Sequence, residues 1–370
     1  MPQNTTTPRV FIAATRQNDG KTTTSLGLLA ALQNRFSSVG FIKPVGQRFV
    51  EVDEQKIDED SVLMQRVFRL NLPLVDMSPI AVEPDFTRRY LESSNYDALV
   101  RRIEKAFDRV AWENRFVLCE GTGHAGVGSV FDLSNAAVAR ILNAKVIIVS
   151  QGGIGRPVDE VSLNQALFEK EGVEVIGVIV NKVLPEKLDY IRDFVGRGLR
   201  RKGLRLLGVV PYQPVLSKPT LELIADELAA ETLAGGDQLQ NIVGRVIVGA
   251  MAAQNAVRLL HPGSLLITPG DREDVLEAVL KFVKEGRGML AGIVLSDALR
   301  PSGTLLTAVR TLPFPVLAAN GDSYEVASKV HDLIVKIRPT DAHKIALVRD
   351  LIARHVDLNQ ILEQIGVPLR

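Results

Sequence analysis

Short runs of apolar residues alternate with segments of helical periodicity along most of the chain. Buried strands of a parallel sheet are continuously apolar, whereas amphipathic helices place apolar residues three and four positions apart. The first half predicts strands over 9–13, 38–42, 116–119, 145–149, 175–180 and 206–210, and helices over 25–32, 60–70, 96–112, 135–142 and 157–171. The second half predicts strands over 245–248, 264–268, 290–295 and 315–318, with helices from Arg272, Ser302 and Ser323. This alternation indicates an α/β fold with a mainly parallel sheet.

Composition changes at residues 229–240, where a helical pattern ends in Ala234-Gly235-Gly236. Such glycine-rich stretches are typical of links between domains. The predicted organisation is a disordered leader over 1–8, a nucleotide-binding domain over 9–228, a linker over 229–240, a smaller α/β domain over 241–340 and a helical tail over 341–370. Within the first domain, Pro73, Pro79 and Pro84 predict an irregular segment.

The first predicted strand and helix are joined by Ala14-Thr15-Arg16-Gln17-Asn18-Asp19-Gly20-Lys21-Thr22-Thr23. Strand, tight loop and helix in this order are the context of a phosphate-binding loop. Loop amides and the helix N-terminus would attract a polyphosphate, Lys21 would reach its outer phosphates, and the Thr22 hydroxyl would bind Mg²⁺. The residues expected at the nucleotide are Thr15, Arg16, Asn18, Asp19, Gly20, Lys21, Thr22 and Thr23. The alternative is a polar cap on a buried helix, with Lys21 merely solvated.

Polar residues follow several of the other predicted strands. Glu120 ends one of them and is expected to hold Mg²⁺, the alternative being an exposed acid at a strand end. Lys43, at the tip of a neighbouring strand, would face the same crevice. Asp60 is equally well explained as a helix cap. Asn181 lies at the same end of the sheet, where its amide suits the edge of adenine.

A glycine-rich loop over 121–128 follows Glu120 and contains four glycines in eight positions. Such a backbone can wrap an anionic group with its own N–H donors. A flexible loop without a ligand is the alternative.

Charge and cysteine content limit the binding partners and the cellular compartment that can be expected. The chain has 370 residues, with 44 basic and 43 acidic side chains and a formal net charge of +1, so no nucleic acid or anionic membrane is expected as partner. The single cysteine, Cys119, fits a reducing compartment. The N-terminal stretch is polar and no apolar run has the length of a membrane span. A cytoplasmic protein is expected.

The ordered series of motifs resembles dethiobiotin synthetase and its P-loop relatives over about residues 8–215. The shared pattern comprises the loop 14–23, Gly40-Phe41-Ile42-Lys43-Pro44-Val45, Asp60 with Gln65-Arg66, Ala81-Val82-Glu83-Pro84, Glu120-Gly121 and Val180-Asn181. Around Asp271-Arg272 the second half is similar to the DRTGG domain. Together the two parts are similar to the amino-terminal region of long bacterial phosphate acetyltransferases, whose acetyltransferase domain is not expected within these residues.

The resemblance implies roles for individual residues. Lys21 and Thr22 would be the P-loop lysine and threonine, with Lys21 and Lys43 catalytic and Lys43 on the substrate side. Thr22, Asp60 and Glu120 would bind Mg²⁺, and Asn181 would contact the adenine of ATP. Dethiobiotin synthetase phosphorylates a carbamate, and the related cobyrinic acid amide synthases phosphorylate a carboxylate. Against the biotin reaction, Gly46-Gln47-Arg48 replaces the small hydroxyl residues of the synthetase.

Two functions therefore stay open. One is an ATP- and Mg²⁺-dependent enzyme that activates a carbamate or carboxylate of an unidentified small molecule by phosphoryl transfer. The other is a nucleotide-sensing regulatory protein in which the second domain binds a small effector or a partner. Relatives of the first domain work as dimers, so a homodimer is expected.

Overall fold

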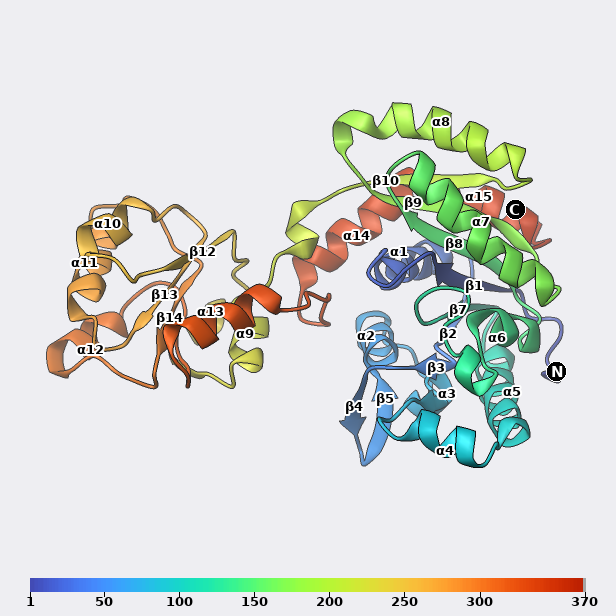
Figure 1. The fold of residues 1–370 in the computed structure, drawn as a ribbon, viewed down its shortest axis with the longest axis horizontal. Coiled ribbons are helices and arrows are strands. Elements are labelled where there is room, and N and C mark those ends of the chain that lie inside the picture. The colour runs from blue at the N-terminus through green and yellow to red at the C-terminus, as the bar shows by residue number, and fades with distance from the viewer. Residues whose placement is uncertain (369–370) are drawn as a thin grey trace. The chain divides into compact units, whose positions relative to one another are not determined.

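The computed structural model describes residues 1–368 and divides into two compact units. Unit 1 contains residues 1–212 and returns with residues 337–370, and unit 2 is the intervening segment 213–336 (Figure 1). Unit 2 is thus an insertion in the chain of unit 1. Both units are α/β, as the hydrophobic pattern predicts.

A six-stranded sheet forms the centre of unit 1, in the order β10-β9-β8-β1-β7-β2. Its strands are β1 (Arg9–Ala14), β2 (Val39–Ile42), β7 (Phe116–Glu120), β8 (Lys145–Gln151), β9 (Val175–Val183) and β10 (Leu206–Pro211). Every neighbouring pair is parallel, so all six carboxyl ends lie on one edge. Ligands of open parallel sheets bind at that edge. The central strand β1, fully buried, delivers the loop 15–20 there.

Helices cover this sheet. They are α1 (Lys21–Gln33), α2 (Glu59–Phe68), α3 (Leu74–Met77), α4 (Phe86–Glu92), α5 (Tyr96–Trp112), α6 (Asn135–Ile141), α7 (Gly155–Lys170), α8 (Leu188–Arg201), α14 (Ala342–His355) and α15 (Leu358–Gln364). In α5, Leu99, Ile103 and Phe107 are buried on one face, as their spacing predicts.

The segment predicted as irregular contains more regular structure than its prolines suggest. A hairpin of β4 (Phe49–Val52) and β5 (Gln55–Asp58) precedes α2, and β3 (Val45–Gly46) pairs with β6 (Ile80–Ala81). Short strands and helices of this kind are set by tertiary contacts rather than by local periodicity.

The N-terminal leader and the helices after residue 341 both pack on unit 1. The leader, predicted as disordered, has the backbone N–H groups of Gln3 and Asn4 donating to Asp108 of α5, at 3.0 and 2.8 Å. The expected tail forms two helices, and α14 buries Ile345, Val348 and Ile352. Helix α14 lies beside α1, the helix that follows the loop 15–20 (Figure 1).

Unit 2 has a mixed five-stranded sheet in the order β11-β15-β14-β13-β12. Its elements are α9 (Leu221–Glu227), β11 (Glu231–Ala234), β12 (Arg245–Val248), α10 (Ala253–Arg258), β13 (Ser264–Pro269), α11 (Glu273–Lys284), β14 (Gly292–Ser296), α12 (Gly303–Val309), β15 (Val316–Ala318) and α13 (Ser323–Asp332). Only β11 runs antiparallel to its neighbour. The expected linker therefore contains a strand of unit 2, and the division between units falls at Gln213.

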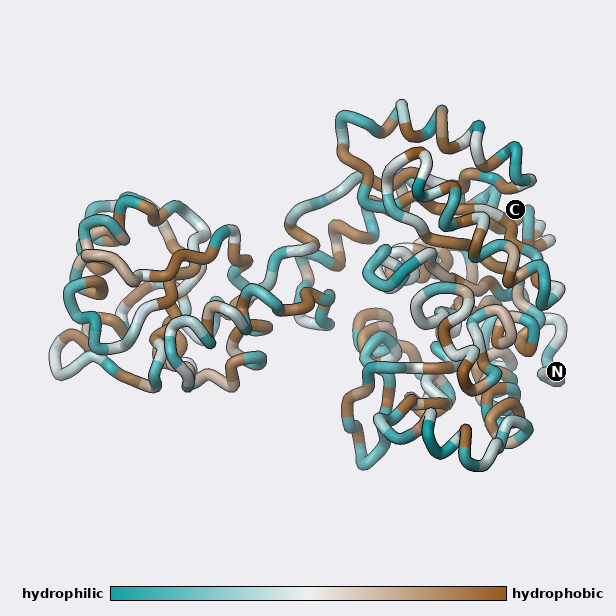
Figure 2. The backbone as a smooth tube through the Cα atoms, in the orientation of Figure 1, coloured by the Kyte–Doolittle hydropathy of each residue, from teal (hydrophilic) through white to brown (hydrophobic). Residues whose placement is uncertain are grey.

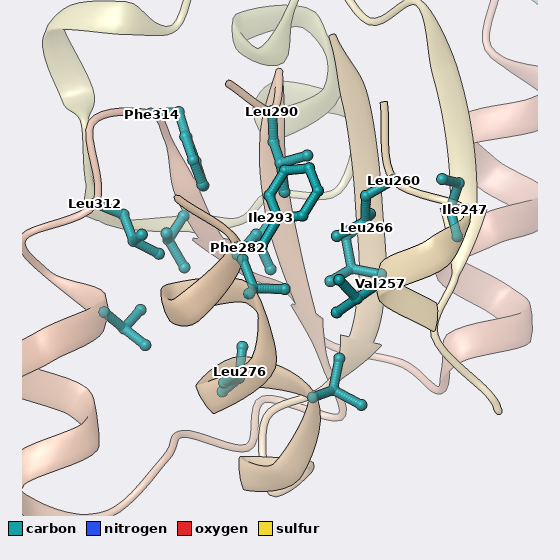
Figure 3. Packing of buried hydrophobic residues seen from close by; sticks show 14 of the residues in the cluster. Ile247, Val257, Leu260, Leu266, Leu276, Phe282, Leu290, Ile293, Leu312 and Phe314 are labelled. Atoms are coloured by element: carbon teal, nitrogen blue, oxygen red, sulfur yellow. The ribbon is translucent and has the colours of Figure 1, made fainter. Parts of the chain in front are cut away.

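Two apolar clusters fill the two faces of this sheet. One packs Phe282, Ile293 and Phe314 with residues of α10, α11 and α12 (Figure 3). The other gathers residues of α9 and α13, including Leu221 and Val326. In each unit the most hydrophobic segments are the central strands (Figure 2). Among residues 1–368, no helix combines the length and apolar character needed to cross a bilayer.

Candidate functional site

The loop between β1 and α1 is held in one conformation by its own side chain Asp19. Oδ2 of Asp19 accepts hydrogen bonds from the Thr15 hydroxyl at 2.6 Å and from the Arg16 N–H at 2.7 Å. Asp19 is buried, and burial raises the pKa of its carboxyl group. The position where phosphate loops usually carry a first glycine is thus occupied by a threonine with a structural partner.

Two residues at the end of β9 donate hydrogen bonds to the same loop. Nδ2 of Asn181 donates to the Asp19 carbonyl at 2.9 Å, and Nζ of Lys182 donates to the Asn18 carbonyl at 2.6 Å. A Cβ at Gly20, which has φ 96°, would overlap Nδ2 of Asn181. The structure therefore places Asn181 directly beneath the loop, and a contact with adenine stays a prediction.

Arg16, one of the residues expected at the nucleotide, has a side-chain partner outside the loop. The half-exposed guanidinium of Arg16 forms an ion pair with Glu160 of α7. Thr23 lies partly exposed in the first turn of α1.

Lys21 and Thr22 begin α1 and face the end of β7. The Thr22 hydroxyl donates to Oε1 of Glu120 at 3.0 Å, while Oε2 of Glu120 is buried without a hydrogen-bond partner. Burial and the charge of Asp60 raise the pKa of Glu120 to about 7, against the attraction of Lys43. Burial lowers the pKa of Lys21, and the charge of Glu120 opposes that effect.

Lys43 and Asp60 join this group from the neighbouring strand and helix. Nζ of Lys43 pairs with Oδ2 of Asp60, lies 3.0 Å from Oδ1 of Asp58 and 3.9 Å from Oε1 of Glu120. Only 6% of Lys43 is exposed. Burial lowers the pKa of Lys43, but the charges of Asp60, Asp58 and Glu120 outweigh burial and raise it overall. The ammonium group is thus enclosed by carboxylates.

Asp58 was not among the residues expected at the site. It is the N-cap of α2, where Oδ1 accepts the Asp60 N–H at 2.9 Å. Its own N–H donates to the Ser78 hydroxyl, also at 2.9 Å. The sequence does carry a signal for it, because aspartate is a preferred residue immediately before a helix, a position predicted for Asp60 from the sequence.

Several amides of the glycine-rich loop already donate within the chain, and its wrapping of an anionic group stays a prediction. The Thr122 N–H donates to Oδ1 of Asn135 at 2.9 Å, and the Ala125 N–H donates to Oδ1 of Asn164 at 2.7 Å. Nδ2 of Asn135 also donates to the carbonyls of Thr122 and His124. These contacts make 121–128 an ordered loop rather than a flexible one.

Some oxygen atoms at this site are of the kind that bind a hard divalent cation. Carboxylates and a hydroxyl are the ligands Mg²⁺ prefers, and it keeps waters and phosphate oxygens for its other positions. Glu120 offers an unpaired buried oxygen beside the Thr22 hydroxyl. Across residues 1–368, no three His, Cys, Asp or Glu side chains are placed to hold a metal by themselves. A cation here would complete its coordination with waters or with the phosphates of a nucleotide.

Two family profiles match the chain. One, described as an AAA domain, covers residues 8–220, and the other, a DRTGG domain, covers residues 223–333. Phosphate acetyltransferase of Pseudomonas putida is 31% identical over 374 residues, covering 97% of this chain and 52% of the relative. That of Pseudomonas aeruginosa is 30% identical over 375 residues, with 97% and 52% covered. The chain thus spans about half the length of these curated relatives.

Two solved structures are weakly similar to this chain. The septum site-determining protein MinD of Pyrococcus horikoshii, complexed with Mg-ADP, is 17% identical, with a TM-score of 0.35, 56% of this chain and 83% of that chain covered. The CBS and DRTGG domains of the regulatory region of Clostridium perfringens pyrophosphatase, complexed with diadenosine tetraphosphate, are 16% identical, with a TM-score of 0.27 and coverage of 43% and 75%. The chain therefore belongs to the AAA domain family, as a dethiobiotin-synthetase-like P-loop domain followed by a DRTGG domain, and is homologous to the amino-terminal region of phosphate acetyltransferases.

Proposed function

We propose that this chain is a nucleotide-sensing regulatory module whose P-loop domain binds ATP or ADP with Mg²⁺ and controls a partner activity. The homology to the amino-terminal region of phosphate acetyltransferases supports this function over phosphoryl transfer to a small acceptor. The partner activity would then be acetyl transfer to phosphate, carried by a separate polypeptide or domain.

The state of Lys43 is the observation on which the proposal rests. An enzyme that activates a carbamate or carboxylate needs a cation facing the acceptor. Lys43 is the residue expected to provide it, yet its ammonium group is shared by Asp58 and Asp60 and is almost fully buried. Held there, it stabilises acids of its own chain rather than an acceptor.

The residues on the phosphate side suit binding. The loop amides and the start of α1 would receive the phosphates, with Lys21 neutralising the outer ones. Thr22 and Glu120, with Asp60 nearby, would hold Mg²⁺, which neutralises phosphate charge when bound.

Calorimetry with ATP and with ADP, each with Mg²⁺, tests the proposal. We expect both nucleotides to bind the parent chain, and Lys21→Ala to lose that binding while keeping its fold by circular dichroism. Lys56→Ala is the matched control, because Lys56 is a half-exposed lysine of the β4–β5 hairpin paired with Glu83. Absence of heat with either nucleotide would refute nucleotide binding.

A phosphate-release assay separates the sensor from the enzyme. The chain is incubated with ATP, Mg²⁺ and, in turn, diamines with bicarbonate and simple dicarboxylates. Binding without acceptor-stimulated release supports the sensor. Phosphate release that depends on one of these acceptors supports carbamate or carboxylate activation instead.

A further inference from the structure

Five ionisable side chains converge at the carboxyl ends of β2 and β7. They are Lys21, Lys43, Asp58, Asp60 and Glu120. Lys43 is the cation in direct ion-pair distance of all three acids. Lys43 is therefore the main counter-ion of the three acids.

Asp58 is fixed by hydrogen bonds of both its side chain and its backbone. Its Oδ1 bonds the Asp60 N–H and its backbone N–H bonds Ser78. A Cβ at Gly46 would overlap its carboxylate, so the side chain has no room to move on that side. Oδ1 of Asp58 lies 3.0 Å from Nζ of Lys43, whereas the Thr22 hydroxyl donates to Glu120.

Asp60 and Glu120 are instead the acids next to the phosphate side. Glu120 shares Oε1 between the Thr22 hydroxyl and the more distant Lys43, and leaves Oε2 unpaired. A divalent cation and a lysine ammonium drawn to the same two carboxylates repel each other at short range. Asp60 and Glu120 therefore cannot pair fully with the cation and with Lys43 at the same time.

We propose that Lys43 competes with the nucleotide-bound divalent cation for Asp60 and Glu120. Asp58 is then a positioning residue, which keeps the ammonium group of Lys43 paired when the cation binds. This inference deepens the proposed function, since it assigns the regulation of the same site. Asp58 acts on the cation only through Lys43. Without Asp58, Lys43 can be satisfied only by the two acids that the cation also needs.

A double-mutant cycle with Mn²⁺ as the probe tests the inference. Mn²⁺ affinity is measured by electron paramagnetic resonance for the parent, Lys43→Met, Asp58→Asn and the double variant, first without nucleotide and then with ADP. We expect Lys43→Met to raise the affinity, because it removes the competitor. Asp58→Asn should lower it about ten-fold in the parent but much less in the Lys43→Met background, since contacting residues couple.

Two results overturn the inference. Equal effects of Asp58→Asn in both backgrounds would mean that Asp58 acts by its charge alone and not through Lys43. No Mn²⁺ binding by any of the four proteins, with or without ADP, would remove the cation from the cluster. ADP binding measured in EDTA reports on the proposed function separately, so a failed cycle with intact ADP binding leaves nucleotide sensing standing. Circular dichroism and thermal melts check that all four proteins fold, and Lys56→Met controls for loss of a lysine.

Discussion

Gly27 of α1 lies directly against Ile352 of α14, so that a Cβ at residue 27 would overlap the Ile352 side chain. The two residues are 325 positions apart, yet they join the helix that starts at the P-loop to a helix that follows the inserted unit 2. The close approach requires glycine here for space, since this position has no positive φ.

Gly27→Ala should therefore destabilise unit 1 by about 1–3 kcal/mol, the usual cost of overpacking a filled core. The cost should be partly reduced in an Ile352→Ala background, because the truncation removes the overlap with Cγ1 of Ile352 and leaves the contact with its Cβ at 2.5 Å. Chemical denaturation of the four proteins measures both values. Gly155→Ala is the control, because a Cβ there meets nothing within 4 Å. Equal costs in both backgrounds would contradict the contact.

Glu120 gives the nucleotide-free chain a stability that depends on pH. Burial first, then Asp60, raises the pKa of its carboxyl group from 4.5 to about 7. The folded state thus binds this proton more tightly than the unfolded state, and its stabilisation is complete below pH 4.5 and is lost as the pH rises through about 7. Glu120→Gln mimics the protonated acid and should remove this dependence.

The free energy of unfolding of parent and Glu120→Gln should be similar at pH 5. By pH 8 the variant should be more stable by up to about 3 kcal/mol, at 1.36 kcal/mol for each unit of pKa. Denaturant titrations in EDTA at both pH values measure the difference, which cancels groups common to both proteins. A difference that stays constant with pH would show that Glu120 does not titrate in this range.

The parts of the fold that could be predicted are those whose burial shows in the local pattern. Strand β1 and helix α5 follow from continuous and periodic apolar residues. The hairpin before α2 and strand β11 are short and half-exposed, so their apolar pattern is weak and tertiary contacts decide them. The packing of α14 on α1 depends on a contact between the two ends of the chain, which no local pattern encodes.

In the candidate site, too, local patterns predict some features while tertiary contacts decide the others. The loop 15–20 and the positions of Lys43 and Glu120 follow from strand ends, because parallel strands bring their carboxyl ends to one edge. The partner of each side chain does not follow. Periodicity places Lys43 at the edge, but only the hairpin and the cap of α2 bring Asp58 to it. Likewise, the glycine content of 121–128 does not predict that Asn135 bonds to the backbone of Thr122 and His124.

Asn135→Ala should loosen the loop 121–128. The change leaves the Thr122 N–H and the carbonyls of Thr122 and His124 without their present partner, and unmade buried hydrogen bonds cost about 1–3 kcal/mol. Relative to the parent, the variant should show faster hydrogen exchange in residues 121–128 and unchanged exchange in β8. Its melting temperature should fall. Asn34→Ala, at the exposed C-cap of α1, serves as control. Unchanged exchange in 121–128 would mean that Asn135 does not order the loop.

Gly20→Ala should abolish nucleotide binding, whereas it should lower the free energy of unfolding only moderately. Residue 20 has φ 96°, which side chains rarely adopt, and a Cβ would overlap Nδ2 of Asn181, so the loop amides must move from their present directions. Strain of this kind costs about 1–3 kcal/mol, whereas phosphate binding depends on several aligned amides at once.

Gly203→Ala is the matched control for that variant, because it has φ 73° and nothing within 4 Å of the added Cβ. Both variants should lose similar stability from backbone strain, but only Gly20→Ala should lose the calorimetric signal with ADP and Mg²⁺. Adding Asn181→Ala to Gly20→Ala removes the overlap without relieving φ, so it should restore part of the stability and little of the binding. ADP affinity equal to that of the parent in Gly20→Ala would mean that phosphates do not bind at this loop.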